Sequence, residues 1–297
     1  MDVTLMTGAT RGLGRVAAEH LLRTRRDRHL VVFARSGDPA AELAKATGNR
    51  NVSTIRCDLK SFDSIRAAVA DLRERDLGPI TGFLANAGVQ EASTDTATAD
   101  GLETTFAVNV LANHLLLTLL RDDFAQPCRI VVVGSDVHDP AHNSMGVVPP
   151  PVWTDARDLA TPRPGGARDG RRAYATSKLG VLYLVHAHRR RLPEDVDIYT
   201  YNPGHVPNTG LLRNVPPVGR AVAQGVGVVL AMVSPRSTMP GPAGRLMAAA
   251  LDGPRPGESG VYVNKGVVVP SSDESYDRER EERLITVADA LCGIVRA

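Results

Sequence analysis

The sequence predicts an α/β protein with a Rossmann-type, doubly wound parallel sheet of about seven strands and helices on both of its faces. Two observations lead to this class. Short β-branched and aliphatic runs alternate with longer helical patterns, and each step between runs is long enough for a right-handed crossover. Continuous apolar runs such as residues 130–133 also suit strands that are buried on both sides.

The elements are expected in that alternating order. Each expected strand is a β-branched or aliphatic run punctuated by Gly, Asp or Pro, and the strands fall at 2–7, 29–34, 52–57, 80–85, 129–134, 196–201 and 260–263. Helices are expected at about 12–24, 61–76, 102–122 and 173–192. The tail from residue 273 opens with charged residues and then has apolar residues at roughly helical spacing, which indicates a docked C-terminal helix.

The whole chain, 1–297, is expected to form one dinucleotide-binding and catalytic domain, because no linker divides it. A Pro-rich stretch within about 136–170 is interpreted as an insertion, and about 202–242 as a lid and substrate region. The insertion contains three consecutive prolines followed by Val152 and Trp153, which would cover an apolar face of the helix at 173–192. We therefore expect a monomer, or at most a dimer through another face.

Composition narrows the function classes. A hydrophobic fraction of 43% and a net charge of +2 exclude a disordered chain and a nucleic-acid binder that relies on charge. Cys57, Cys128 and Cys292 have neither metal-ligand nor redox spacing, so we expect no metal and a reducing, cytoplasmic location. The N-terminus lacks a signal-peptide pattern and no apolar run is long enough for a membrane span, so a soluble protein is expected.

A glycine-rich loop with the sequence TGATRGLG, at 7–14, joins the first expected strand to the first expected helix. Glycines let the backbone approach a diphosphate, and the helix N-terminus supplies free N–H donors and the positive end of the dipole. A structural turn is the alternative for a lone glycine triplet. The strand before and the helix after the loop favour dinucleotide binding.

The second expected strand ends at Arg35, where a site for NAD usually has an acidic residue. Arg11 in the glycine loop is expected to face the same ribose, and two guanidinium groups suit a 2′-phosphate. Asp38 follows too late to be the acid that binds NAD. This pattern favours NADPH, and the alternative is that both arginines are merely solvated.

Tyr174 and Lys178 are four residues apart and share one face of the expected helix. The ammonium is expected to favour the phenolate and lower the pKa of Tyr174, which makes the phenol a proton donor to a developing alkoxide. Ser135 follows a central strand and is expected in the same crevice. Asn109 is a polar residue in an apolar helix, which suggests a proton-relay water. Alone, the Tyr/Lys spacing also fits an ordinary surface pair.

In their order along nearly the whole chain, these motifs resemble the short-chain dehydrogenase/reductase family. The motifs are the glycine loop, Asp58-Leu59, Asn86-Ala87-Gly88, Asn109, Ser135, Tyr174-x-x-x-Lys178 and Pro203-Gly204. The resemblance implies a catalytic tetrad of Asn109, Ser135, Tyr174 and Lys178. It implies cofactor contacts from loops at one edge of the sheet, namely Gly8, Thr10, Arg11, Gly12, Leu13, Gly14, Arg35, Asp58, Leu59, Asn86, Ala87, Gly88, Tyr174, Lys178, Pro203, Gly204, Val206 and Thr209. Asp136 and His205 are expected to contact the substrate.

Finer similarities indicate a subgroup. The stretches 101–120, 209–213 and 259–262 are similar to those of retinol dehydrogenases and light-dependent protochlorophyllide reductases. The cysteine that the latter carry shortly before the catalytic tyrosine is missing from 169–173. A dark ketoreductase of bacterial specialised metabolism, as in antibiotic biosynthesis, is therefore favoured over photochemistry.

Together these observations predict an NADPH-dependent ketoreductase for a bulky, mostly apolar, polyketide-like small molecule, with Tyr174 as the proton donor. The alternatives left open are alcohol oxidation or C=C reduction within the same family, and a non-catalytic regulator that only binds the cofactor. Three histidines are interpreted without a catalytic role. His138 is expected in a solvated loop, and His186 and His188 at the exposed end of the catalytic helix.

Overall fold

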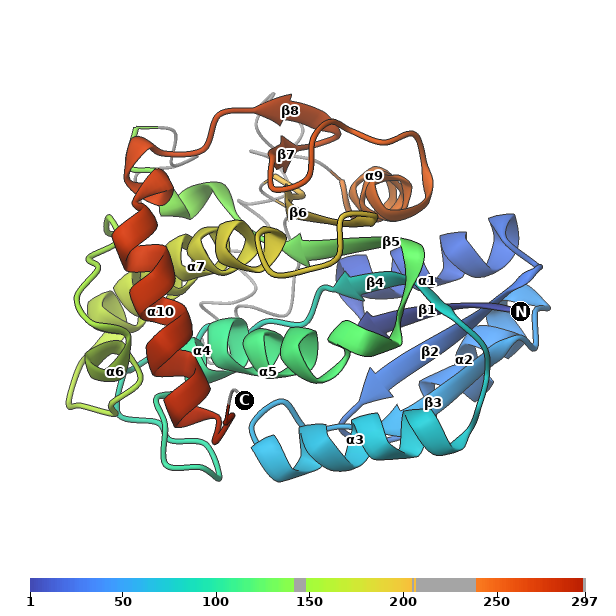
Figure 1. The fold of residues 1–297 in the computed structure, drawn as a ribbon, viewed down its shortest axis with the longest axis horizontal. Helices are drawn as coiled ribbons and strands as arrows, with labels where there is room; N and C mark the ends of the chain where they lie inside the picture. Colours follow the sequence, from blue (N-terminus) through green and yellow to red (C-terminus); the bar gives the residue numbers. More distant parts are fainter. Residues whose placement is uncertain (142–147, 205, 207–238, 296–297) are drawn as a thin grey trace, which may run out of the picture.

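The computed structural model describes residues 1–141, 148–204, 206 and 239–295. Their strands form an eight-stranded sheet in the order β3-β2-β1-β4-β5-β6-β7-β8 (Figure 1). The strands are β1 (Asp2–Thr7), β2 (Arg28–Ala34), β3 (Val52–Arg56), β4 (Ile80–Ala85), β5 (Phe124–Val133), β6 (Val196–Asn202), β7 (Tyr262–Asn264) and β8 (Val267–Val269). The chain order reverses between β1 and β4, and ligands of such sheets bind outside the carboxyl ends of the strands at that point.

Strands β1 to β7 are parallel, so the prediction of a Rossmann-type parallel sheet is confirmed. β8 adds an antiparallel edge strand that the sequence did not indicate, because three valines show no alternation. Lys265 and Gly266 join β7 to β8 with positive φ angles of 51° and 89°. Two consecutive residues of this kind are typical of a tight hairpin turn.

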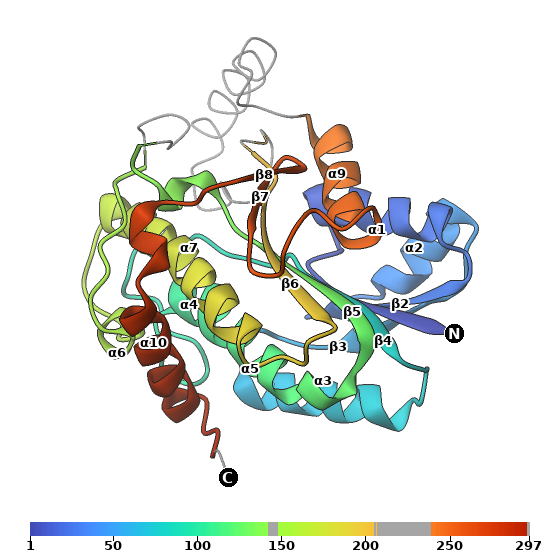
Figure 2. The same cartoon turned by 45° about the horizontal axis from the view of Figure 1, so that its top comes forward.

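Helices cover both faces of the sheet. One face carries α1 (Gly12–Thr24), α2 (Pro39–Thr47) and α9 (Pro240–Asp252), and the other carries α3 (Phe62–Glu74), α5 (Ala112–Leu119) and α7 (Ala167–Arg189) (Figure 2). Successive strand residues pack on opposite faces, as Leu5 and Met6 of β1 show. Burial of these apolar side chains on both sides is the main force that holds the layers together.

The helix expected at 102–122 is interrupted. α4 (Thr104–Phe106) leads through a π-helical turn at Ala107–Leu111 into α5. The Glu103 carboxylate begins α4, since it accepts hydrogen bonds from the N–H groups of Thr105 at 3.0 Å and Phe106 at 2.6 Å. A π-helical turn bonds each residue one position further along than an α-helix does. The side chains after the turn therefore point in directions that are rotated from those of an uninterrupted α-helix.

The C-terminal helix α10 (Arg278–Leu291) docks as predicted, with Leu284 and Ile285 buried. It lies across α7 and the short α6 (Ala156–Leu159) (Figure 1). Trp153, just before α6, packs edge-to-face on Tyr183 of α7 with 4.7 Å between the ring centroids. α10 and the segment that precedes α7 thus cover the outer face of the helix that carries Tyr174.

Candidate active site

The glycine-rich loop lies between β1 and α1, at the carboxyl edge of the sheet. Gly8 has a φ of +72°, and a Cβ there would lie 2.6 Å from Nδ2 of Asn86. A Cβ on Gly14 would overlap the carbonyl oxygen of Gly8. Only glycine fits at these two positions, because a side chain there would overlap the loop after β4 or the glycine loop itself.

The start of α1 has no side-chain cap, because Arg11 at the N-cap position makes no capping hydrogen bond within the described residues. The loop after β4 supports the glycine loop from behind. Nδ2 of Asn86 donates to the Gly8 carbonyl at 2.9 Å, and Oγ1 of Thr7 accepts from the Ala87 N–H at 3.0 Å. Free N–H donors and this rigid backing fit the diphosphate of a dinucleotide.

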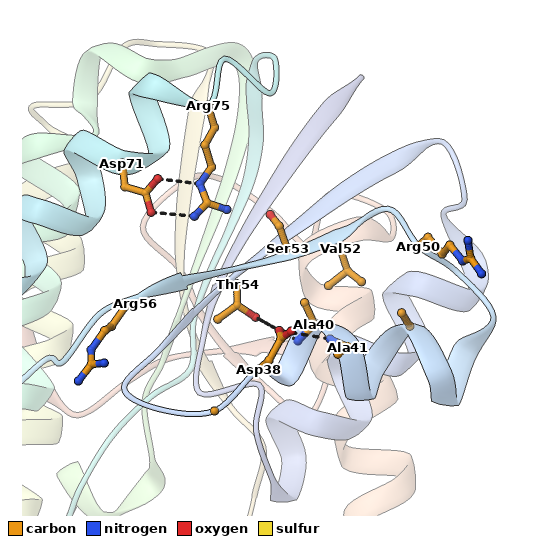
Figure 3. A pocket seen from close by; sticks show the side chains of 12 residues that line it. Asp38, Ala40, Ala41, Arg50, Val52, Ser53, Thr54, Arg56, Asp71 and Arg75 are labelled. Carbon is orange, nitrogen blue, oxygen red and sulfur yellow. Dashed lines mark hydrogen bonds and ion pairs between the residues drawn. The ribbon is translucent and has the colours of Figure 1, made fainter.

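Arg11 and Arg35 are exposed, and they follow the neighbouring parallel strands β1 and β2 at one edge of the sheet. Asp38 follows Arg35 by three residues and is engaged in other contacts (Figure 3). Its Oδ1 accepts from Oγ1 of Thr54 at 2.8 Å and from the Ala41 N–H at 3.3 Å. Asp38 therefore caps α2.

An open pocket of about 650 Å³ lies along the edge strand β3, with α2 and the end of α3 as its walls. Figure 3 shows the side chains that line it. Its charged lining includes Arg50 and Arg56. Arg75 in the same pocket donates from Nε and Nη2 to Asp71 at 2.7 and 2.8 Å. None of the four expected catalytic residues lines this pocket. The pocket is lined by residues that follow β2, on the side where the adenosine of a cofactor is expected, and it is separate from the expected catalytic residues.

Two further loops reach the carboxyl edge of the sheet. Asp58 follows β3, and its Oδ1 accepts from the Lys60 N–H at 3.1 Å. Gly88 follows β4, where a Cβ would lie 3.2 Å from Oδ1 of Asn109 and 3.7 Å from Nζ of Lys178. The structure thus places the loop after β4 directly against two of the expected catalytic side chains.

Tyr174 and Lys178 lie one turn apart on α7, and both are buried. Nζ of Lys178 is 5.5 Å from the centroid of the Tyr174 ring and donates to the Val133 carbonyl at 2.8 Å. Val133 ends β5, and Ser135 follows it with a hydroxyl that interacts with the Tyr174 phenol. The structure therefore brings Ser135, Tyr174 and Lys178 together as the sequence predicted.

The expected direction of the Tyr174 pKa is wrong in this structure. Burial and the nearby charge of Asp136 raise the pKa of Tyr174 well above its ordinary value, and Ser135 opposes the rise only in part. Burial also lowers the pKa of Lys178 to about 8. The physical reason is that both groups are desolvated and that the ammonium bonds the Val133 carbonyl. Tyr174 is held as the protonated phenol, which is the form a proton donor needs.

Asn109 sits in the π-helical turn and uses both ends of its amide. Nδ2 donates to the Val89 carbonyl and to Oγ of Ser177, both at 2.9 Å, and Oδ1 accepts from the Val89 N–H at 2.9 Å. These bonds tie the turn to the loop after β4 and to α7. They explain a polar residue in an apolar helix through protein partners, whereas the sequence suggested a water.

The loop after β6 is described only in part. The Gly204 N–H donates to Oδ1 of Asn202 at 3.1 Å, and Val206 is buried in the core beneath α1 and α9. His205 and Thr209, which the sequence placed in the site, lie outside the described residues, as does most of the expected lid. The last residues of that expected lid already belong to α9.

His138 is 2% exposed, so its interpretation as a solvated loop residue is wrong. Its Nδ1 lies 2.6 Å from the Ser135 carbonyl oxygen, and its Nε2 lies 3.3 Å from the Ser272 N–H. The ring also meets Tyr262 edge-on at 5.1 Å between centroids. The sequence could not show this burial, because Ser272 and Tyr262 come from segments more than a hundred residues away. His138 ties the turn that begins at Ser135 to the strand pair β7 and β8.

The cysteines carry no sign of reactivity. Cys57, Cys128 and Cys292 are free and buried, and burial raises the pKa of each thiol to about 12. Since the thiolate is the reactive form, these side chains are inert in the folded protein. In the described ranges no group of three or more His, Cys, Asp or Glu side chains is placed to hold a metal, and no helix there is long and apolar enough to cross a membrane.

Comparisons with known proteins agree with this geometry. The family model of the short chain dehydrogenases matches residues 2–146. Protochlorophyllide reductase A, chloroplastic, of Oryza sativa subsp. japonica is 30% identical over 330 residues, which cover 99% of this chain and 81% of that protein. The carbonyl reductase Sniffer of D. melanogaster has a TM-score of 0.63 at 19% identity, covering 92% and 99% of the two chains. NADPH-bound carbonyl reductase from chicken fatty liver has a TM-score of 0.62 at 19% identity, covering 90% and 98%.

The glycine loop on a Rossmann-type sheet, together with the buried Tyr174 and Lys178, is typical of oxidoreductases that use a nicotinamide dinucleotide. The chain belongs to the short-chain dehydrogenase/reductase family, whose members use NAD(H) or NADP(H). The two solved carbonyl reductases support the fold alone, because their identity to this chain is low.

Proposed function

We propose that this protein is an NADPH-dependent ketoreductase that reduces the carbonyl of a bulky, mostly apolar small molecule. The position of Tyr174 carries this proposal. Its phenol is buried and protonated, it interacts with the Ser135 hydroxyl, and it lies one helical turn from the Lys178 ammonium. A protonated phenol beside a hydroxyl and an ammonium is suited to proton donation to a carbonyl oxygen.

Each residue then has a task that its position suits. NADPH, when bound, supplies the hydride to the carbonyl carbon. The Tyr174 hydroxyl gives its proton to the carbonyl oxygen, and the Ser135 hydroxyl holds that oxygen. Lys178 places a positive charge near the phenol as the proton leaves. Asn109 acts as a positioning residue, since its amide bonds both the loop after β4 and α7 and so fixes their relative position.

NADPH is favoured over NADH by charge. Arg11 and Arg35 are exposed at the edge where the ribose of the adenosine would lie, and Asp38 is engaged in capping α2. Guanidinium groups bind a phosphate through paired, charge-assisted hydrogen bonds. The NADPH-bound carbonyl reductase from chicken shares this fold. The polyketide-like nature of the substrate rests on the subgroup resemblance in the sequence.

The test is NADPH oxidation with a panel of aromatic ketones, for the wild type and for Tyr174→Phe. The variant keeps the ring and loses the proton, so turnover should fall roughly 10²–10⁴-fold while NADPH affinity survives. Tyr183→Phe is the matched control, because it removes the same atom from the same helix. The Tyr183 hydroxyl donates to the Glu274 carbonyl at 2.9 Å, away from Ser135, and its loss should leave turnover unchanged.

Unchanged turnover in Tyr174→Phe would reject the proposed proton donor. Two parallel assays with the wild type separate the related reactions. Oxidation of the matching alcohols with NADP⁺ tests the reverse direction, and enones test C=C reduction. Tight NADPH binding with no turnover in any assay would indicate a regulator that binds the cofactor without catalysis.

A further inference from the structure

The carboxylate of Asp136 lies beside the atoms that the proposed reaction uses. Asp136 follows Ser135 at the start of a short 3-10 turn after β5, with its Oδ1 3.4 Å from Oγ of Ser135. Its charge also acts on the Tyr174 phenol. Since Ser135 is the proposed holder of the carbonyl oxygen, the Asp136 carboxylate lies within about two hydrogen-bond lengths of that oxygen's position.

Asp136 is half-buried and forms no ion pair within the described residues. Two groups that could be cationic contact the residues just before Asp136, and both are engaged elsewhere. Lys178 donates to the Val133 carbonyl at 2.8 Å, and the ring nitrogens of His138 lie against the Ser135 carbonyl and the Ser272 N–H. A carboxylate drawn partly out of water without a cation is unfavourable. A ligand that brings a cation or an N–H or O–H donor would relieve this cost.

The hydroxyl of Tyr262 is a second, independent indication that a polar group of a ligand binds here. Tyr262 is 5% exposed, and its hydroxyl is buried without a hydrogen-bond partner in the part of the chain that the structure describes. Buried tyrosine hydroxyls usually have a partner. The ring lies against the segment that leads into Asp136. Its Cε2 is 3.9 Å from where a Cβ on Gly134 would be, and the His138 ring meets it edge-on.

Asn202 is close to the Tyr262 phenol but is held by other groups. Nδ2 of Asn202 donates to Oδ1 of Asn264 at 3.1 Å, and its Oδ1 accepts from the Gly204 N–H at 3.1 Å. No hydrogen bond of ordinary geometry joins Asn202 to the phenol. The charge of Asp136 also acts on Tyr262. The Tyr262 ring and the Asp136 carboxylate therefore lie against the same short segment, Gly134 and Ser135.

We propose that Asp136 and Tyr262 form a subsite for a hydrogen-bond-donating group of the substrate, an ammonium above all, that lies about two to four bonds from the reacting carbonyl. This inference rests on the proposed function, because Ser135 and Tyr174 define where the carbonyl lies. The carboxylate pairs with the donor, and the Tyr262 oxygen accepts a second hydrogen from it. An anionic group in the same place is repelled, while the rest of the substrate stays apolar.

The test uses three ketones that share a phenyl carbonyl. One is β-aminopropiophenone, which carries a primary ammonium with several N–H groups, the second is its uncharged isostere with C–H in place of N–H, and the third is benzoylpropionate, which carries a carboxylate. The wild type should have a higher kcat/KM for the ammonium ketone than for the isostere. That ratio should fall on the order of 10-fold or more in Asp136→Asn and by a smaller factor in Tyr262→Phe.

Asp158→Asn is the control for net charge. Asp158 is an exposed acid on α6, so its loss should leave the ratio as it is in the wild type. Equal ratios in the wild type and Asp136→Asn would overturn the subsite, as would a wild-type preference for benzoylpropionate. If Asp136→Asn does not fold, Tyr262→Phe decides by the same comparison.

A second readout separates this inference from the proposed function. If none of the ketones is reduced, the ketoreductase proposal fails, and calorimetric titration of the ammonium ketone into NADPH-loaded protein decides the subsite. Weaker binding to Asp136→Asn than to Asp158→Asn would support the subsite without catalysis. Equal binding to both variants would overturn it.

Discussion

The imidazole rings of His114 and His188 meet inside the protein, with Nδ1 of His114 3.1 Å from Nε2 of His188. The other nitrogen of His114 lies 2.9 Å from Oδ1 of Asp289, so the three side chains link α5, α7 and α10. His188 is 4% exposed, and His186 lies 3.1 Å from the carboxylate of Glu281. The interpretation of both histidines as the exposed end of the catalytic helix is therefore wrong, because α10 covers them.

Removing one member of this hydrogen-bonded group, which consists of His188, His114 and Asp289, should lower the stability of the protein. Asp289→Ala would leave the buried Nε2–H of His114 without its acceptor, which typically costs about 1–3 kcal/mol in the free energy of unfolding. Urea denaturation measures the loss. Thr286→Ala, an exposed change on the same helix, should cost less than about 0.5 kcal/mol. Equal stability of the two variants would contradict the role assigned to Asp289.

Arg35→Ala should separate the two nicotinamide cofactors. Loss of a charge-assisted contact to the 2′-phosphate should weaken NADPH binding by about 1.5–3 kcal/mol, roughly 10- to 150-fold, and leave NADH binding nearly unchanged. Fluorescence titration of both cofactors gives the two dissociation constants. Arg50→Ala, an exposed arginine of the pocket in Figure 3, is the matched control. A loss of equal size for NADH and NADPH would rule out the phosphate contact.

Lys178→Met should stabilise the ligand-free protein while it abolishes turnover. The ammonium is buried, and its pKa is lowered from 10.5 to about 8, so the charged form is disfavoured in the folded state. After allowance for the lost bond to the Val133 carbonyl, we expect a gain of about 1–3 kcal/mol in the free energy of unfolding near neutral pH.

The same lysine predicts a dependence on pH. Between about pH 8 and 10.5 the unfolded chain still holds the Lys178 proton that the folded chain has lost, so the stability contributed at this site rises with pH. The stability of the wild type should therefore approach that of Lys178→Met as the pH increases. The raised pKa of Tyr174 works in the opposite direction, but the tyrosine is present in both proteins. Urea denaturation of both at several pH values measures the gap, and a constant gap would refute the explanation.

The protein should be a monomer. α10 and Trp153 cover the outer face of α7, so this helix has little apolar surface left for a second copy. Light scattering after size-exclusion chromatography should give a mass near 31.7 kDa, that of one chain. A stable tetramer, or a crystal structure in which α7 pairs with its symmetry mate, would show that the prediction is wrong.

Local sequence patterns were sufficient for the parallel core of the fold. β1, β4 and α1 have the expected bounds, since each is set by its own apolar run, and glycine also marks the end of β1 and the start of α1. The same holds for the crevice, because Ser135 follows a central strand and Tyr174 and Lys178 are one turn apart. Chain order and helical spacing are enough to bring these side chains together.

What the sequence did not reveal depends on contacts between distant segments. α2 was missed because it is short and alanine-rich, and because Asp38 was considered only as a ligand for NAD although it caps that helix. The π-helical turn around Asn109 was missed because periodicity assumes a regular helix. The burial of His138 and His188 comes from the C-terminal segment, and no local pattern shows it.

The three buried thiols can be used to follow local unfolding of the protein. Cys57 lies between β3 and α3, Cys128 in β5, and Cys292 just after α10, so each samples a different part of the fold. With pKa values raised to about 12, they react with an alkylating reagent only when their surroundings open. The labelling rate at each position therefore measures a local opening free energy. If α10 detaches early, Cys292 should be labelled faster than Cys128, which lies in the central strand β5.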